Sequence, residues 1–125
     1  MPVTSAWYDK SRRMILCELI DPWTAQESAV NMATIADLMD EVDYKVPLVI
    51  DMTNGTLPFG TLRELPQIGS MRHTNHPNNG GTIIIGAQGF TARVADIFSR
   101  VFSRIDFVDT MDDALAVAAR KYPVT

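Results

Sequence analysis

The hydrophobic positions along the chain fall into short segments, and the first two of these segments are strand-like. They cover Val3–Tyr8 and Arg13–Ile20, with the polar segment Asp9–Arg12 between them. Two strand-like segments joined by a short polar turn are typical of a β-hairpin. We therefore expect the chain to open with two antiparallel strands.

A helical pattern follows the predicted hairpin. Asp21, Pro22 and Trp23 end the second strand. Thr24 and Glu27 have the spacing of a capping box, in which a hydroxyl and a carboxylate satisfy the backbone amides at a helix start. Apolar residues then recur at helical spacing and predict one face of a helix of about 18 residues. This face comprises Ala25, Ala29, Met32, Ala33, Ala36 and Met39, and it is widened by Val30, Ile35 and Leu38.

Two later segments, Val46–Asp51 and Thr82–Gly86, are apolar without alternation. A strand that is covered on both faces, as in a parallel sheet, has this pattern. Pro47 has no N–H to donate to the sheet, so we expect it near the start of its strand. Thr53–Thr56 is expected to form a loop between the two strands, and His73–Gly81 a second, turn-rich loop.

Three further helices are predicted from their N-terminal caps and apolar stripes. They are expected over residues 61–72, 91–105 and 111–122, and a short strand at Ile105–Val108 separates the last two. Pro66 removes one hydrogen bond from the first of these helices unless it lies in the first turn. The caps that predict the helix starts are Thr61 with Glu64, Thr91, and Thr110 with Asp113.

The order of these elements, β-β-α-β-α-β-α-β-α, predicts an α/β fold. After the opening hairpin, each strand–helix–strand step is expected to be a right-handed crossover. We therefore expect a single mixed, mostly parallel sheet of about five strands covered by about four helices. No repeat, low-complexity segment or linker divides the chain, so we predict one domain spanning residues 1–125.

The composition argues against several classes of function. The 125 residues are 46% hydrophobic and 21% charged, as in an ordinary globular domain, and the net charge is -4. Because nucleic acids and anionic membrane surfaces attract proteins rich in Lys and Arg, we expect neither as a partner. No apolar run approaches the ~18 residues of a membrane span, and the N-terminus has no signal-peptide pattern. We therefore expect a cytoplasmic protein.

The order of elements and several short phrases resemble the STAS domain, especially the small SpoIIAA-like (STAS/SEC14-type) bacterial proteins. The resemblance covers nearly the whole chain and implies the α/β fold described above. It is carried by the long first helix, the Phe-containing helix and the segments Met14–Ile20 with Asp21–Thr24, Leu48–Asp51 with its polar loop, Thr82–Gly86 and Phe107–Thr110.

The resemblance implies a regulatory or binding module. Such domains act as antagonists of anti-sigma factors, as cytosolic parts of transporters, or as lipid- or nucleotide-responsive units. In the antagonists, an Asp-Ser-Ser-Gly phrase opens the second helix and its serine is phosphorylated. The corresponding stretch here is Leu57–Leu62, in which Thr61 is the only hydroxyl. We expect Thr61 to cap the helix rather than to accept a phosphate.

Polar and glycine-containing loops follow the predicted parallel strands, and ligands of open α/β sheets bind at the carboxyl ends of the strands. Gly86 and Gly89 precede the helix expected to start at Thr91. They can let backbone amides and the helix dipole approach an anion, and Arg93 can add a charge-assisted contact. A plain tight turn is nevertheless the preferred interpretation, because no phosphate-binding fingerprint is present. The candidate ligand residues are Asp51, Thr53, Asn54, Gly86, Gln88, Gly89, Phe90, Thr91 and Arg93.

No catalytic or metal-binding pattern is recognisable, so we expect no metal and no cofactor. Asp51 and Asp109 both end strands and could form an acid pair, but an Asp at a strand end more often accepts turn amides. His73 and His76 have no Cys, Asp or Glu near them in sequence, so we expect solvated loop histidines rather than zinc ligands. Cys17, the single cysteine, is expected to be a buried structural thiol.

Two charged surfaces could dock a protein partner or a second copy of this chain. One is basic, and the other is acidic at a helix C-terminus, where negative charge opposes the helix dipole. Solvated helix faces are the simpler interpretation of both. The surfaces comprise Arg93, Arg100 and Arg104 on the helix expected over 91–105, and Asp37, Asp40, Glu41 and Asp43 at the end of the first helix.

Three functions follow in order of preference. The first is a non-enzymatic STAS-type module that regulates by binding a protein partner, which includes self-association as a homodimer. The second is a carrier or sensor of a small anionic or lipid ligand, such as a nucleotide or phosphate, with an apolar pocket near Phe59 and Phe90. The third is an enzyme that uses Asp51 and Asp109.

Overall fold

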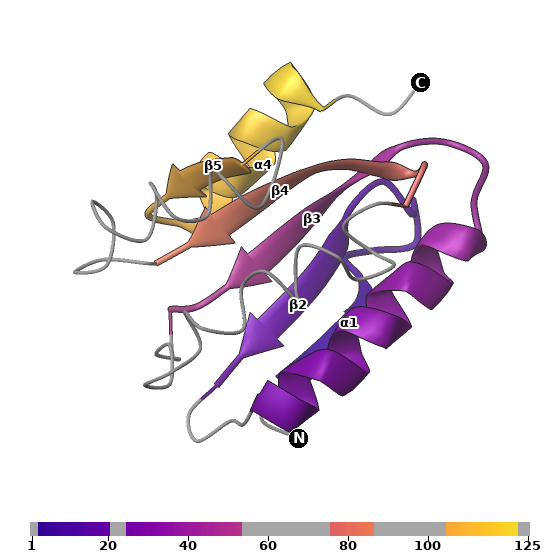
Figure 1. Ribbon diagram of the computed structural model, residues 1–125. Coiled ribbons are helices and arrows are strands. Elements are labelled where there is room, and N and C mark those ends of the chain that lie inside the picture. The colour runs from indigo at the N-terminus through magenta and orange to yellow at the C-terminus, as the bar shows by residue number, and fades with distance from the viewer. Residues whose placement is uncertain (1–2, 21–24, 54–75, 87–104, 123–125) are drawn as a thin grey trace.

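Five strands form one mixed sheet, in which they lie side by side in the order of the chain (Figure 1). The computed structural model describes residues 3–20, 25–53, 76–86 and 105–122. Within these ranges it contains strands β1 (Val3–Trp7), β2 (Ile15–Leu19), β3 (Val46–Asp51), β4 (Asn79–Ile85) and β5 (Ile105–Val108), and helices α1 (Ala25–Asp40) and α4 (Met111–Lys121).

The sheet begins with an antiparallel hairpin. β1 pairs with β2 in antiparallel orientation, whereas the β2–β3, β3–β4 and β4–β5 pairs are parallel. The predicted α/β fold, with a mixed five-stranded sheet and an opening hairpin, is therefore confirmed. Two of the predicted helices, over 61–72 and 91–105, lie outside the described residues.

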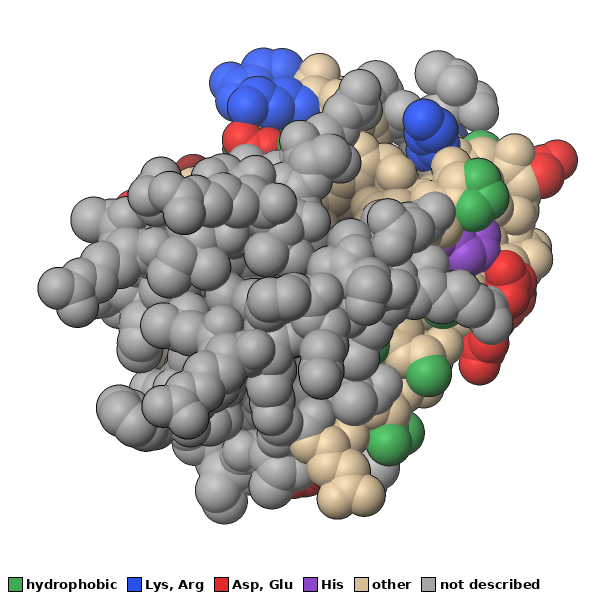
Figure 2. Space-filling model, in the orientation of Figure 1, with side chains coloured by type: hydrophobic (Ala, Val, Ile, Leu, Met, Phe, Trp, Pro, Cys, Tyr) green, Lys and Arg blue, Asp and Glu red, His purple; other side chains and the backbone are tan. Residues whose placement is uncertain are grey.

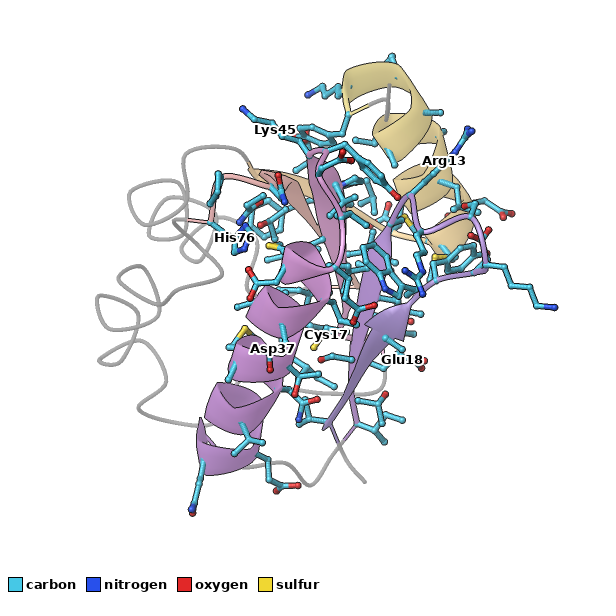
Figure 3. All side chains as sticks on the ribbon, turned by 90° about the vertical axis from the view of Figure 1, so that its right-hand side faces the viewer. Arg13, Cys17, Glu18, Asp37, Lys45 and His76 are labelled. Carbon is cyan, nitrogen blue, oxygen red and sulfur yellow. The ribbon has the colours of Figure 1, made fainter. Side chains whose placement is uncertain are left out.

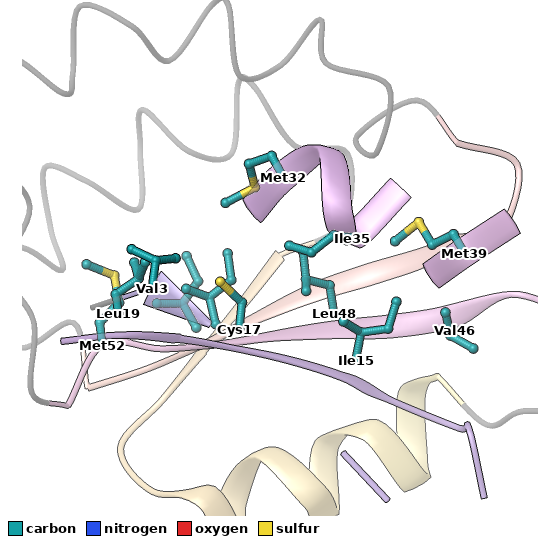
Figure 4. Close-up of a cluster of buried hydrophobic side chains, with 12 residues drawn as sticks. Val3, Ile15, Cys17, Leu19, Met32, Ile35, Met39, Val46, Leu48 and Met52 are labelled. Atoms are coloured by element: carbon teal, nitrogen blue, oxygen red, sulfur yellow. The ribbon is translucent and has the colours of Figure 1, made fainter. Parts of the chain in front are cut away.

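The two described helices lie on opposite faces of the sheet, as Figure 4 shows. Helix α1 packs on β1 and β2, and α4 packs on β3, β4 and β5. The last helix begins where its cap predicts, because the Thr110 hydroxyl accepts a hydrogen bond from the Asp113 backbone N–H at 3.1 Å. The described part of the chain is thus a three-layer arrangement of helix, sheet and helix.

The face of the sheet beneath α1 carries the larger hydrophobic core (Figure 4). Met32, Ile35 and Met39 of α1 pack against strand residues that include Ile15, Cys17 and Leu48. The sequence-derived helix face was too wide, because Val30 is 60% exposed and Ala33 is also exposed. Each residue of an α-helix is rotated by about 100° from the last, so a narrow stripe contacts the sheet and these two side chains turn away from it.

The central strands are buried on both faces, as their unbroken apolar segments predict. In β3, Leu48 and Ile50 belong to the core under α1, whereas Val49 belongs to the smaller core under α4. In β4, Ile83 and Ile85 lie under α4 and Ile84 under α1. Pro47 is the second residue of β3, at a shift in the pairing register, and this confirms its predicted place near the strand start.

Strand β4 begins at Asn79, so the predicted turn-rich loop ending at Gly81 was too long. Two consecutive glycines are typical of a turn, but here they belong to the strand, and Gly81 pairs with Pro47. Gly81 has φ +151°, and a Cβ at this position would lie 2.6 Å from the Tyr122 ring. The glycine is therefore needed for close packing of Tyr122, the residue after α4, against the sheet.

Candidate functional site

At the carboxyl end of the parallel strands, where a ligand site was predicted, local contacts join the described residues. The Thr53 N–H donates to Asp51 Oδ1 at 2.9 Å, and the Gly86 N–H donates to the Val108 carbonyl at 3.0 Å. Gly86 has φ +76°, and a Cβ at this position would lie 3.0 Å from Thr53 Cα. Of the candidate ligand residues, Asp51, Thr53 and Gly86 are therefore brought together. Asn54, Gln88, Gly89, Phe90, Thr91 and Arg93 lie outside the described residues.

Asp51 and Asp109 are not adjacent in the sheet. The register aligns Asp51 with Ile85 and Ile85 with Val108, so the strand ends that carry the two carboxylates are separated by a whole strand. Two strand spacings amount to about 10 Å between the backbones. Asp51 accepts a hydrogen bond from the Thr53 amide, which is the turn role expected of an Asp at a strand end.

Charge differs between the two ends of the sheet. Within the described ranges, the charged residues at the carboxyl end of the parallel strands are all acidic: Glu18, Glu27, Asp51, Asp109, Asp112 and Asp113. The described lysines and arginines all lie at the amino end, in the β1–β2 turn, before β3 and at the end of α4 (Figures 2 and 3). They are Lys10, Arg12, Arg13, Lys45, Arg120 and Lys121.

The acidic C-terminal end of α1 is tied to the start of β4 by His76. Asp37, Asp40, Glu41 and Asp43 are all exposed, and Figure 2 shows acidic side chains beside this histidine. His76 Nε2 lies 2.7 Å from Asp40 Oδ1, and the His76 side chain is only 8% exposed. Its Nδ1 accepts the Asn78 N–H at 3.0 Å, which places the ring proton on Nε2, facing Asp40.

This contact corrects the prediction that His76 is a solvated loop residue. No acidic residue stands near it in sequence, but the fold brings Asp40 to it from 36 positions earlier. The other predicted histidine, His73, lies outside the described residues, as do Thr61, Arg93, Arg100 and Arg104.

Asn78 holds the same helix end, and the sequence gives no signal for this role. Its Nδ2 donates to the Met39 carbonyl at 3.0 Å and to the Val42 carbonyl at 2.8 Å. The last carbonyls of a helix lack partners within it, so these bonds satisfy groups that are otherwise left to water. Arg12 Nη1 lies 3.7 Å from Glu41 Oε1 and adds an exposed ion pair.

Cys17 is fully buried in the middle of β2, which confirms the predicted structural thiol. Burial raises the pKa of the Cys17 thiol above its ordinary value, so the thiolate that reacts with electrophiles is disfavoured. The residue contributes to the core under α1 rather than to a reactive site.

A cavity that sequence reasoning missed lies between the β1–β2 turn and the C-terminal half of α4. Its volume is about 330 Å³. Residues Tyr8, Asp9, Ser11, Arg13 and Met14 line it from the hairpin side, and residues Leu115, Ala118, Ala119 and Tyr122 line it from α4 and the residue after it. The two groups are about a hundred positions apart in the chain, so no local motif could have indicated the cavity.

The described residues contain no group of three or more His, Cys, Asp or Glu placed to hold a metal ion, and no described helix is long and apolar enough to cross a membrane. No family model matches the chain, and neither the curated proteins nor the solved structures include a match to it.

Proposed function

We propose that this chain is a non-enzymatic regulatory module of the STAS type, resembling the SpoIIAA-like bacterial proteins, that acts in the cytoplasm by binding a protein partner. The observation that carries the proposal is the sheet. Its strands lie in chain order after an opening antiparallel hairpin, with α1 and α4 on opposite faces. The helices expected over 61–72 and 91–105 would complete four helices around a mostly parallel sheet.

The described side chains of chemically reactive type serve the fold, and this supports binding rather than catalysis. Asp51 accepts a turn amide, Cys17 is buried with a raised pKa, and His76 bonds Asp40 and the Asn78 amide. General acids and nucleophiles need a free face toward a substrate. Asp51 and His76 are instead hydrogen-bonded to neighbouring groups of the fold, and Cys17 is buried.

The acidic C-terminal end of α1 is the partner surface that the described residues support best. It exposes Asp37, Asp40 and Glu41 on one helix end. Carboxylates at this end oppose the helix dipole by several tenths of a kcal/mol each, while Asp40 contacts His76 and Glu41 contacts Arg12. Hydrogen bonds from His76 and Asn78 hold the end of α1 against the start of β4, so the positions of the acidic groups are fixed relative to the sheet. Such a surface suits a partner that presents lysines or arginines.

A second copy of this chain is one basic partner that the sequence itself supplies. Arg93, Arg100 and Arg104 would form the complementary edge, on the helix expected over 91–105. In this form of the proposal the module is a homodimer in which each acidic end contacts the basic edge of the other copy.

The test reverses charge on the acidic end. Asp37→Lys with Glu41→Lys replaces two exposed side chains, and Glu18→Lys is a single charge reversal at the opposite end of the sheet. The three proteins are compared by analytical sedimentation and by affinity capture from native lysate, with bound proteins and metabolites both identified. Binding of a protein partner or self-association should survive Glu18→Lys and be lost in the double variant.

Two outcomes would overturn the proposal. One is a protein complex that all three chains form equally. The other is a metabolite captured reproducibly by every chain without any protein. Circular dichroism of the double variant checks that it is folded before the comparison is made.

A further inference from the structure

The cavity beside the β1–β2 turn has an apolar floor. Met14 is 5% exposed and belongs to the core under α4, and Leu115 and Ala118 pack against the same core. The small side chains of Ala118 and Ala119 on α4 leave the space open. This floor would bury the apolar body of a ligand.

Two tyrosines contribute aromatic walls. The Tyr122 hydroxyl donates to Asp106 Oδ2 at 2.5 Å, so its ring is held in place before any ligand arrives. Tyr8 is 40% exposed at the other side of the lining, although it is a large aromatic residue. Rigid aromatic side chains of this kind bind flat apolar groups with little loss of conformational entropy.

The hairpin side of the cavity carries two charged residues, Asp9 and Arg13. The Ser11 N–H and hydroxyl both donate to Asp9 Oδ1 and hold that carboxylate in the turn. Among the described residues Arg13 forms no ion pair within 4.0 Å, but after the hydrogen bonds from Ser11 its charge also lowers the pKa of the Asp9 carboxyl. The cavity lies at the amino end of the sheet, where basic residues stand among acidic ones that include Asp9 and Asp106. The positive charge available to a ligand is therefore that of Arg13 in the lining itself.

From this geometry we infer that the cavity binds a small aromatic carboxylate. Its flat body would lie over Met14, Leu115 and Ala118, and its carboxylate would accept hydrogen bonds from the Arg13 guanidinium. A dianionic phosphate suits the lining less well, because Asp9 contributes a negative charge of its own. The inference rests on the cavity alone and is independent of the acidic end of α1.

The volume sets the size of the ligand. A water molecule occupies about 30 Å³ in the liquid, so 330 Å³ holds about a dozen non-hydrogen atoms. A fused two-ring carboxylate such as naphthoate is of this size. Ligands this small, bound in open pockets, saturate in the millimolar range.

The experiment titrates naphthoate into the isotope-labelled full chain and follows backbone amide shifts by NMR. Uncharged naphthylmethanol is the matched ligand control. Arg13→Gln removes the proposed anion contact, and Lys45→Gln removes a basic residue from the same end of the sheet but not from the lining. Ala118→Leu fills the cavity without adding charge, and its urea unfolding midpoint reports whether it has folded.

We expect saturable shifts at Ser11, Met14, Ala118 and Tyr122 in the wild-type chain and in Lys45→Gln. Binding should be about tenfold weaker for naphthylmethanol and for Arg13→Gln, since a charge-assisted hydrogen bond is lost in each case. A folded Ala118→Leu chain should show no saturable shifts. Equal binding of the acid and the alcohol, equal binding by Arg13→Gln, or shifts that never saturate would overturn the inference.

Discussion

His76 and Asp40 stand 36 residues apart in the chain, yet His76 Nε2 and Asp40 Oδ1 are separated by 2.7 Å. The contact joins the last residue of α1 to the segment that leads into β4. Asn78 strengthens the same junction with two hydrogen bonds to carbonyls at the helix end. The junction fixes the end of α1 that carries the acidic partner surface, so its stability and the proposed function depend on the same contacts.

The first prediction concerns Asn78. Asn78→Ala removes two hydrogen bonds of about 1 kcal/mol each, so the free energy of unfolding should fall by about 2 kcal/mol. Urea unfolding followed by circular dichroism measures the change. Pro77, the exposed neighbour of Asn78, supplies the control, because Pro77→Ala should change the free energy of unfolding much less. Equal losses in the two variants would show that the side-chain amide of Asn78 is not what holds the helix end.

A second prediction concerns the pH dependence of stability through Asp106. Partial burial raises the pKa of this carboxyl, but the hydrogen bonds from Lys121 and Tyr122 outweigh that effect and hold its pKa below the ordinary value. A carboxyl whose pKa is lower in the folded than in the unfolded chain stabilises the fold in its ionised form. Its contribution is complete above the unfolded pKa of about 3.9 and is lost as the pH falls through the folded pKa.

Asp106→Asn should therefore lower the free energy of unfolding by about 1 kcal/mol at neutral pH, and the difference from wild type should shrink in strong acid. Urea titrations at a series of pH values test this. Tyr122→Phe removes one of the two donors and should make the Asp106→Asn effect smaller. A difference that stays constant down to the most acidic pH would mean that the charge of Asp106 does not stabilise the fold.

Much of the fold could be predicted because local sequence patterns determine its strands and helix starts. The unbroken apolar segment at Val46–Asp51 predicted a strand buried on both faces, and the Thr110 hydroxyl marked the start of α4. In both cases the deciding interactions lie within a few residues or follow from simple periodicity. The α1 face was predicted less well, because apolar residues such as Val30 fit a helical stripe even though they turn away from the sheet.

The sites were harder to predict because their parts come from distant positions. The partner of His76 is 36 residues away, and the cavity joins the β1–β2 turn to the end of α4. Neither association is marked by a local sequence motif. Asp51 shows the opposite case, since its acceptance of the Thr53 amide two residues later is a local turn property that residue type alone indicates.

A third prediction follows from Gly86, which was considered for its ability to let backbone approach a ligand. In the structure the approaching backbone is Thr53, and a Cβ on residue 86 would lie 3.0 Å from Thr53 Cα. Gly86→Ala combines this contact with a positive φ and should destabilise the fold by about 1 to 3 kcal/mol. Gly86→Asn tolerates the positive φ better but keeps the Cβ, so it should recover only part of the loss. Unchanged stability in Gly86→Ala would show that residue 86 and Thr53 do not approach each other as closely as described.

The last prediction uses the alkylation of Cys17 to report unfolding that exposes the core under α1. The thiol is buried between two strands, where Cys17 pairs with Ser5 of β1 and Ile50 of β3. Burial raises its pKa, so the native chain offers an alkylating reagent neither access nor thiolate. Modification at mildly alkaline pH should then be slower than in urea by roughly a thousandfold or more, because it requires the chain to unfold. Asn78→Ala should speed the reaction in proportion to its loss of stability, although residue 78 does not belong to the core around Cys17. Native Cys17 that reacts within a few-fold of the unfolded rate, measured by mass spectrometry, would mean that β1 or α1 separates from β2 without global unfolding.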